Sequence, residues 1–491
     1  MPSYETYYDC NSSEQFLQLI NSCCKLDEQK NIKKIADERK LQESVIFTLQ
    51  FNASVNQNPE LKKEAISWIN KIASALKILP ESNYKYYLDK SKGNNQFITT
   101  PAINLRMLSF HTARAALQSQ INLKNNHVIF ELALSERDYT DQKMDEFSAL
   151  VKAAYISMGL KKIKFYIQGD HYQVDPKKYS ENSEKEMQRI KDLIKEAICN
   201  DVYNIDIDTS KFETDNPAKS DRENQYMNAK LTAELLFFIR KLENKMKLPC
   251  TISVGGEVGE VGGTNTKYPQ VNAYLAMIKE MLEEHIKNYT TTSEEKLEIK
   301  KLEIEKVKGL SKISINVGSA HGGQLGPDGK PLPDVPLDFA AHHDVYMNGD
   351  DPLAQRKHVL SVQHGASTLP KHYFPLFPAM HVAEIHLATG FQNLTWNVLE
   401  KHNPLLYNKM RSAVFEKYSK QISEHKNEAI GFAKECKRVT KFFKRDLLLM
   451  DSQVLNQLEK ELQQEFSEIM HSLYTLLLPK GNNAAKGDKA D

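Results

Sequence analysis

Short runs rich in valine and isoleucine alternate with helix-length segments from about residue 100 to about residue 395. The predicted strands are Ala102–Leu105, Val128–Leu134, Ile163–Ile167, Tyr203–Ile207, Thr251–Val254, Ile313–Val317, Val359–Gln363 and Val382–Leu387. Such strands, separated by amphipathic helices, are typical of a parallel sheet that is buried on both faces. Eight of these units within roughly 300 residues favour a closed barrel over an open sheet. The sequence therefore predicts the α/β class and a (β/α)8 TIM barrel.

Helical segments flank the predicted barrel on both sides, because apolar residues recur there at helical spacing between charged ones. The N-terminal segment carries no recognisable chemistry, so we expect it to serve packing or an oligomer contact. Part of the C-terminal segment is expected to close the barrel, and part is expected to be an interaction arm. The expected organisation is a helical N-terminal extension over 1–95, the barrel over 96–398 with a charged helical insertion at about 287–310, a helical C-terminal extension over 399–480, and a disordered tail over 481–491.

Composition limits the classes of partner. The chain has 491 residues, and its 65 Lys and Arg residues nearly balance its 64 Asp and Glu residues. This balance argues against nucleic acid or an anionic membrane surface as a partner. The N-terminus lacks the features of a signal peptide, and no apolar run reaches the length of a membrane span. The six cysteines form neither a CxxC pair nor a disulfide-like framework, so we expect a soluble cytoplasmic protein.

The segment from Thr251 to Asn265 places two acids, Glu257 and Glu260, among five glycines directly after a predicted strand. Glycine allows the backbone to approach a ligand closely and to adopt positive φ angles. Alone, this pattern is equally typical of a Gly-rich turn with two solvated acids. Similar polar endings on the neighbouring strands favour a functional site.

Polar residues follow six consecutive predicted strands, at the barrel end where such folds place their chemistry. Three imidazoles at successive strand ends could converge on a metal ion, although a single histidine there would more often be structural. His342, His343, His372 and His381 do not fall at strand ends, and we interpret them as surface or loop residues. The donor set suits a catalytic Zn2+, with Co2+, Mn2+ or Fe2+ as alternatives. The candidate ligands are His171, His321 and His364, with Glu257 or Asp208 nearby.

Two glycine-containing turns are candidates for binding a phosphate. Gly365-Ala366-Ser367-Thr368 follows the seventh strand, where barrels often bind phosphate through backbone N–H groups and hydroxyls. Gly322-Gly323, after the sixth strand, offers a second close approach of backbone. Ordinary turn glycines are the alternative interpretation of both segments.

Taken in chain order, the polar residues at the strand ends and the glycine-containing turns resemble the motifs of the class II, metal-dependent fructose-bisphosphate and tagatose-bisphosphate aldolases. The resemblance covers about residues 100–395. It implies that Asp170 exchanges a proton with the C4 hydroxyl of a substrate, and that a metal ion activates the substrate's ketone. The implied metal-site residues are His171, His321 and His364 as ligands, Asp208 as an acid near the metal, and Glu257 as an acid for an alternative metal position.

The resemblance also implies a set of substrate contacts, and the sequence departs from the family in part of it. Asn104 and Ser135 fall where the family has an Asn and a Ser that touch substrate or its phosphate. After Gly262-Gly263 the family has acids on a mobile loop, whereas Thr264-Asn265-Thr266 stand here, and Glu260 is the candidate substitute for moving the C3 proton. The family's polar eighth strand is replaced by His386-Leu387-Ala388-Thr389-Gly390. The predicted substrate- and phosphate-binding residues are Asn104, Ser135, Gly322, Gly365, Ser367, Thr368, His386 and Thr389.

These patterns together predict a divergent class II aldolase. It would cleave a ketose phosphate such as fructose 1,6-bisphosphate reversibly into dihydroxyacetone phosphate and an aldehyde, as in glycolysis and gluconeogenesis. A sugar-phosphate epimerase with the same metal chemistry and a non-catalytic accessory subunit remain alternatives. A metallohydrolase is disfavoured, because Pro101–Leu105 lacks the His-x-His usual on the first strand of such barrels. The resemblance suggests a homo-oligomer, a dimer or higher.

Overall fold

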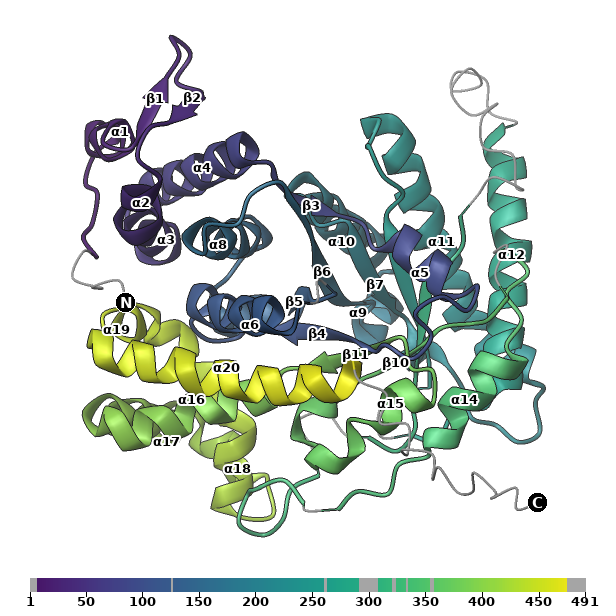
Figure 1. Ribbon diagram of the computed structural model, residues 1–491. Helices are drawn as coiled ribbons and strands as arrows, with labels where there is room; N and C mark the ends of the chain where they lie inside the picture. Colours follow the sequence, from purple (N-terminus) through teal and green to yellow (C-terminus); the bar gives the residue numbers. More distant parts are fainter. Residues whose placement is uncertain are drawn as a thin grey trace, which may run out of the picture.

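The computed structural model describes residues 7–124, 127–259, 263–290, 308–319, 324–332, 334–353 and 357–474. Its centre is a closed barrel of parallel strands (Figure 1). The strands pair in chain order, and the last of them pairs with the first. They are β4 (Thr100–Asn104), β5 (Ile129–Ala133), β6 (Ile163–Gln173), β7 (Asn204–Asp208), β8 (Ser253–Val258), β9 (Lys312–Ile315), β10 (Ser361–Gln363) and β11 (Glu384–Leu387). The predicted (β/α)8 barrel is confirmed, and each predicted strand overlaps an observed one.

Helices between the strands cover the outside of the barrel. The longest begins with a capping box, in which Ser220 Oγ accepts from the Glu223 N–H and the Glu223 carboxylate accepts from the Ser220 N–H. The larger helices are α6 (Ser109–Leu123), α8 (Met144–Ser157), α10 (Ser183–Cys199), α11 (Asp221–Met246), α12 (Tyr268–Thr290), α14 (Phe339–Asn348) and α16 (Thr389–His402). Shorter turns of helix are α7 (Glu136–Thr140), α9 (Pro176–Glu181), η2 (Ser210–Phe212), η4 (Ala366–Thr368), η5 (Lys371–Tyr373) and α15 (Leu376–Ala379).

The middle of the barrel interior is polar. Alternate residues of a strand face the inside, and in barrels of this kind bulky aliphatic side chains usually fill that space. Here Lys312 Nζ lies 2.7 Å from Gln168 Oε1 and 3.0 Å from Asp206 Oδ2, which joins β9 to β6 and β7. Gln168 in turn donates to Glu131 and Glu384 at 3.0 and 2.9 Å. We call Glu131, Gln168, Asp206, Lys312 and Glu384 the polar layer.

The last part of the N-terminal extension, β3 (Ile78–Glu81) and α5 (Tyr84–Lys90), closes one end of the barrel. Strand β3 pairs with the first residues of β6, and the Tyr87 hydroxyl on α5 donates to Glu384 in the polar layer. Besides helices, this region contains three strands that the sequence analysis did not predict. The other elements are α1 (Ser13–Asn21), β1 (Cys24–Leu26), β2 (Ile32–Ile35), α2 (Glu38–Lys40), η1 (Leu41–Val45), α3 (Ile46–Val55) and α4 (Pro59–Leu76).

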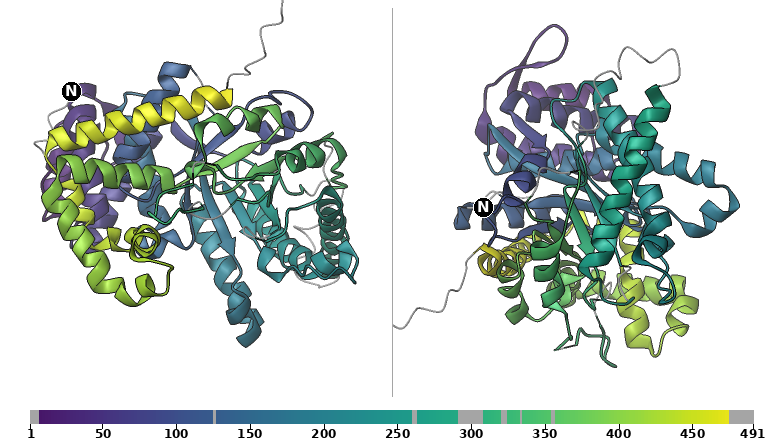
Figure 2. Two further views of the ribbon diagram at one scale, coloured as in Figure 1. Left: turned by 90° about the horizontal axis from the view of Figure 1, so that it is seen from below. Right: turned by 90° about the vertical axis from the view of Figure 1, so that its right-hand side faces the viewer.

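The C-terminal helices lie beside the N-terminal ones, on the same side of the barrel (Figures 1 and 2). The Arg445 guanidinium pairs with the Asp9 carboxylate, with Nη1 3.0 Å from Oδ1, and joins the two extensions. Ser119 on α6 donates to the Gln463 carbonyl at 2.8 Å, so the last helix packs along α6. These elements are α17 (Pro404–Ser423), α18 (Glu428–Glu435), η6 (Cys436–Phe442), α19 (Lys444–Leu448) and α20 (Ser452–Tyr474).

Two predicted segments fall mainly or wholly outside the described residues. The charged insertion at about 287–310 overlaps the undescribed range 291–307, and the tail over 481–491 lies beyond residue 474. Within the part of the chain that the structure describes, no helix is both long enough and apolar enough to cross a membrane.

Candidate active site

A β-bulge in β6 brings two neighbouring side chains to the same end of the barrel. From Gly169 to Tyr172, β6 advances three residues while its partner β7 advances two, from Ile205 to Ile207. His171 absorbs the extra residue with a φ of 45°, a left-handed conformation that is uncommon outside glycine. In a regular strand Asp170 and His171 would point to opposite faces. The bulge instead lets both side chains line one pocket.

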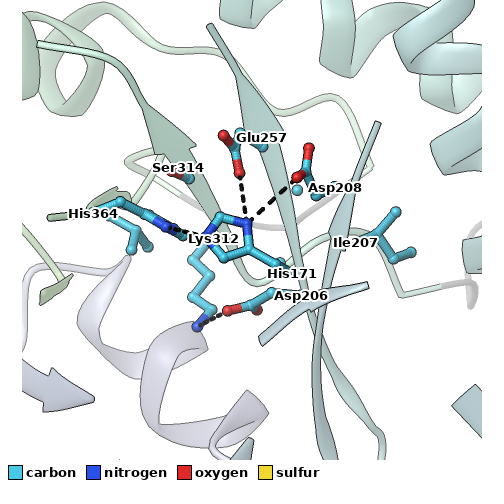
Figure 3. A pocket seen from close by; sticks show the side chains of 11 residues that line it. His171, Asp206, Ile207, Asp208, Glu257, Lys312, Ser314 and His364 are labelled. Carbon is cyan, nitrogen blue, oxygen red and sulfur yellow. Dashed lines mark hydrogen bonds and ion pairs between the residues drawn. The ribbon is translucent and has the colours of Figure 1, made fainter. Parts of the chain in front are cut away.

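His171 is the centre of the predicted metal group (Figure 3). Its Nε2 lies 2.8 Å from His364 Nδ1. Its Nδ1 lies 3.4 Å from Asp208 Oδ2 and 3.7 Å from Glu257 Oε2. One donor atom each from His171, Glu257 and His364 falls within 4.8 Å of the others. These side chains therefore come together from the carboxyl ends of four strands: β6, β7, β8 and β10.

The electrostatics of this group suit a cation. Burial raises the pKa of Glu257 well above its usual value, and the nearby charge of Asp208 raises it further. Burial also acts against the charge of Asp208, but bonding to His171 and Ser210 outweighs it and lowers that pKa. Asp208 and Glu257 are therefore two buried carboxylates that both lie near one imidazole nitrogen, His171 Nδ1. Because imidazole nitrogens and carboxylate oxygens are ligands of zinc and related divalent metals, the residues present fit such an ion.

Asp170 lies between two imidazoles. Its Oδ1 is 3.9 Å from His171 Nε2 and 3.3 Å from His386 Nδ1. Burial opposes its charge, but His171 and His386 outweigh burial and hold the pKa of Asp170 well below its usual value. The contact with His386 lacks hydrogen-bond geometry, so Oδ1 has no hydrogen-bond partner among the described residues. Asp170 is thus an ionised carboxylate with an acceptor atom to spare.

His386 connects the metal group to the polar layer. Its ring stacks on that of His364, with the centroids 4.2 Å apart. Its Nδ1 lies 3.0 Å from Glu131 Oε2, and its Nε2 lies 2.8 Å from Glu384 Oε1. Both ring nitrogens therefore already face carboxylates, in a side chain that is 5% exposed.

The three carboxyl groups of the polar layer differ in pKa. Burial raises the pKa of Asp206 to about 6, although Lys312 acts in the opposite direction. Burial also opposes the charge of Glu384, but Lys312 and His386 outweigh it and lower that pKa to about 2. Burial raises the pKa of Glu131 to about 7, despite its contact with His386. Within the layer the carboxyl group with the lowest pKa is therefore Glu384, which contacts Lys312 and His386.

A pocket of about 970 Å³ opens above these groups, at the carboxyl ends of the strands. It has room for a sugar phosphate, since pockets for small molecules commonly measure roughly 300–1,000 Å³. Seven of the eight predicted substrate-binding residues line it: Asn104, Ser135, Gly365, Ser367, Thr368, His386 and Thr389. Three predicted site residues lie outside the described part of the chain: Glu260, His321 and Gly322.

The loops after β10 and β11 are tied to each other at the pocket wall. The Gly390 N–H donates to Ser367 Oγ at 3.1 Å. A Cβ at Gly390 would lie 2.3 Å from the Ser367 carbonyl oxygen, so the close approach of these two backbone segments requires glycine at position 390. Arg106 Nη1 donates to Thr389 Oγ1 at 3.1 Å and thereby fixes the loop after β11 to the loop after β4.

The sequence analysis missed Glu131, Lys312 and Arg106. Glu131 is a charged residue within an apolar run, and that signal could have identified a buried polar group in the barrel. The interpretation of His342 as a surface or loop residue is wrong, because its side chain is fully buried. Its ring nitrogens bond Ser361 and Gln363 at 2.9 Å each, and Gln363 precedes the predicted ligand His364.

The sequence matches no protein-family model and no curated protein. Solved structures do resemble it. A probable tagatose 6 phosphate kinase from Sinorhizobium meliloti 1021 is 12% identical, with a TM-score of 0.50 over 76% of this chain and 97% of that chain. The likeness is one of fold. At lower TM-scores, the YdjI aldolase from Escherichia coli K12 is 13% identical (TM-score 0.40, 76% of this chain and 99% of that chain). A fructuronate-tagaturonate epimerase, UxaE, from Cohnella laeviribosi is 10% identical (TM-score 0.46, 77% and 82%).

Proposed function

We propose that this chain is a metal-dependent aldolase and a divergent relative of the class II fructose-bisphosphate and tagatose-bisphosphate aldolases. Its reaction would be the reversible cleavage of a ketose phosphate, such as fructose 1,6-bisphosphate, into dihydroxyacetone phosphate and an aldehyde. The bulge in β6 is the observation that carries the proposal. It places an ionised acid, Asp170, beside the candidate ligand His171 at the floor of a pocket.

His171 and His364 would hold the metal ion, together with Glu257 or Asp208. His321, the third imidazole in this proposal, lies outside the described residues. When bound, a divalent metal supplies Lewis-acid polarisation of the substrate's ketone oxygen. The loops after β10 and β11, with Gly365, Ser367 and Thr368, would then orient a substrate phosphate through N–H groups and hydroxyls.

Asp170 would act on the C4 hydroxyl of the substrate. In cleavage its carboxylate takes the hydroxyl proton as the C3–C4 bond breaks and the C4 carbonyl forms, and in condensation it returns that proton. The low pKa of Asp170 keeps it ionised at neutral pH. His386, held by Glu131 and Glu384, lies against one oxygen of Asp170 and would fix the orientation of the carboxylate.

Replacement of the proposed base tests the assignment. Asp170→Asn should retain bound metal and lower kcat by about 10²- to 10⁴-fold, because proton transfer is lost while the ligands remain. Metal analysis and a coupled assay for triose phosphate release measure the two effects. Asp192→Asn, on the exposed face of α10, is the control and should keep full activity. Undiminished turnover in Asp170→Asn would contradict the proposal.

Assays of the purified wild-type chain separate the alternative functions. About one metal ion per chain and chelator-sensitive release of dihydroxyacetone phosphate from fructose 1,6-bisphosphate would support the aldolase. Conversion of a ketose phosphate into its C4 epimer without triose phosphate release would favour an epimerase. Bound metal without turnover on a panel of ketose phosphates would contradict both, and absence of metal and turnover would favour an accessory subunit.

A further inference from the structure

The C-terminal extension forms part of the pocket wall. Lys434 on α18 and Lys437 on η6 line the same pocket of about 970 Å³ as Asp170 and His171. Both lysines are half-buried. The Lys437 ammonium lies 5.5 Å from the centre of the Tyr139 ring, on α7 after β5. An element outside the eight βα units therefore presents positive charge to the space where a substrate would lie.

The anionic groups near Lys437 are already engaged. Glu136 pairs with Arg106 at 2.5 Å and accepts from the Tyr139 hydroxyl at 3.1 Å. Glu435 pairs with Arg438 at 2.8 Å. Within the described residues, no carboxylate lies within ion-pair distance of Lys437. Burial lowers the pKa of Lys437, and the positive charge of Arg106 lowers it further, although Glu136 and Glu435 act in the opposite direction.

The two ends of the pocket differ in chemistry. The metal group lies at the ends of β6, β7, β8 and β10, where it would bind the ketone end of a substrate. Arg106, Tyr139 and the C-terminal extension lie towards β4, β5 and β11, because Arg106 bonds Thr389 after β11 and Glu136 after β5. A substrate held by its ketone at the first end can extend its far end towards the lysines.

We propose that Lys437, with Lys434 beside it, binds the terminal oxyanion at C6 of a ketose substrate, either a phosphate or a carboxylate. This inference rests on the proposed function and deepens it, since it assigns a substrate-binding role to the C-terminal extension. An ammonium group in a partly desolvated wall gains a charge-assisted hydrogen bond when the oxyanion enters. Specificity for an anionic C6 would then depend on an element outside the barrel.

Binding measurements with matched ligands test the inference. Isothermal titration calorimetry of the metal-loaded full chain, in an Asp170→Asn background that slows cleavage, compares fructose 1,6-bisphosphate with fructose 1-phosphate, which differ only in the C6 phosphate. Fructuronate compared with fructose tests a C6 carboxylate. Lys437→Met should weaken binding of the ligand with the preferred C6 oxyanion by about 10- to 100-fold, the loss expected for a hydrogen bond to a charged group. The paired ligand that lacks the C6 oxyanion should bind with little change in affinity.

Two variants control for structure. Lys437→Arg keeps the charge and should restore most of the affinity. Lys441→Met, on the same η6 segment but away from the pocket lining, should leave the affinity unchanged. Equal effects of Lys437→Met on both ligands of a pair, or no effect, would overturn the inference. So would a chain with Lys437 intact, in the same Asp170→Asn background, that gains no affinity from either C6 oxyanion. The proposed aldol cleavage is judged separately, by metal content and by the effect of Asp170→Asn.

Discussion

Lys312 is a positively charged side chain held among carboxylates in the barrel interior. Its side chain is 2% exposed, and it contacts both Asp206 and Glu384. Burial acts against its charge, but the two acids outweigh burial and raise the pKa of Lys312. A buried ion pair of this kind adds little net stability compared with an apolar core, yet removal of one partner leaves the other charge uncompensated.

Lys312→Met should therefore lower the free energy of unfolding by about 3–5 kcal/mol. Urea denaturation followed by circular dichroism measures the change. Lys409→Met is a suitable control, because Lys409 pairs with Asp446 at 3.1 Å on the surface with 62% of its side chain exposed. Such pairs contribute about 1 kcal/mol or less. A Lys312→Met protein as stable as the control variant would show that the polar layer rearranges around the missing charge.

At the residue scale, the sequence predicted which side chains come together at the pocket better than it predicted what surrounds them. The residue types and their positions after strands were sufficient to select Asp170, His171, Glu257 and His364. Nothing local distinguishes Lys312, because an isolated lysine in a strand is normally taken to face solvent. Its burial depends on Asp206 and Glu384, which come from strands far apart in the chain. His342 was misjudged for the same reason, since its partners lie on another element.

At the scale of the element, the bulge in β6 depends on a contact between Gly169 and Tyr172. Tyr172 folds back over Gly169 across the bulge, so that a Cβ at position 169 would lie 2.4 Å from the Tyr172 ring. The Tyr172 hydroxyl has no hydrogen-bond partner among the described residues. The ring, rather than its hydroxyl, therefore packs against the glycine and supports the bulge that turns His171 inward.

Gly169→Ala should displace the bulge, because the added methyl group overlaps the ring. We expect a loss of about 1–3 kcal/mol in stability, typical of overpacking, together with weaker metal binding as His171 moves. Thermal unfolding and metal titration measure the two effects. Tyr172→Phe keeps the ring and should leave both unchanged. In the Gly169→Ala background, Tyr172→Leu should recover metal affinity; failure to do so would argue against contact between the methyl group and the ring as the cause.

The elements themselves were largely predictable, since short apolar segments between helix-length segments marked all eight strands. The bulge was not, because it is defined by pairing with β7, and no feature of Gln168–Gln173 alone fixes that register. Strand β3 was missed as well. Its Ile78-Leu79-Pro80-Glu81 sequence is short and contains proline, which is more typical of an edge strand or a non-strand segment.

At the scale of the whole molecule, one pocket collects side chains from the barrel and from the C-terminal extension, and α5 closes the opposite end. The metal group therefore lies on a floor that the N-terminal extension supports through Tyr87 and Glu384. Because the donor atoms exist together only in the folded chain, an ion bound there stabilises the entire fold.

Addition of zinc or manganese to chelator-treated protein should raise the midpoint temperature of unfolding. The gain in stability is about 2.7 kcal/mol when free metal is 100 times its Kd. Differential scanning calorimetry measures the shift. His364→Ala should abolish it, whereas His372→Ala, at an exposed position, should retain it. An equal shift in both variants would place the bound ion elsewhere.

The packing of α20 along α6 also has a consequence for synthesis of the chain. Ser119 and Gln463, which bond across this contact, are separated by 344 residues. At ribosomal speeds of 5–20 residues per second, α20 is completed roughly 17 to 70 seconds after α6. Throughout that interval, the side of α6 that α20 later covers lacks its native cover. A nascent chain of this protein therefore exposes that side of α6 to other contacts until α20 is made and docks on it.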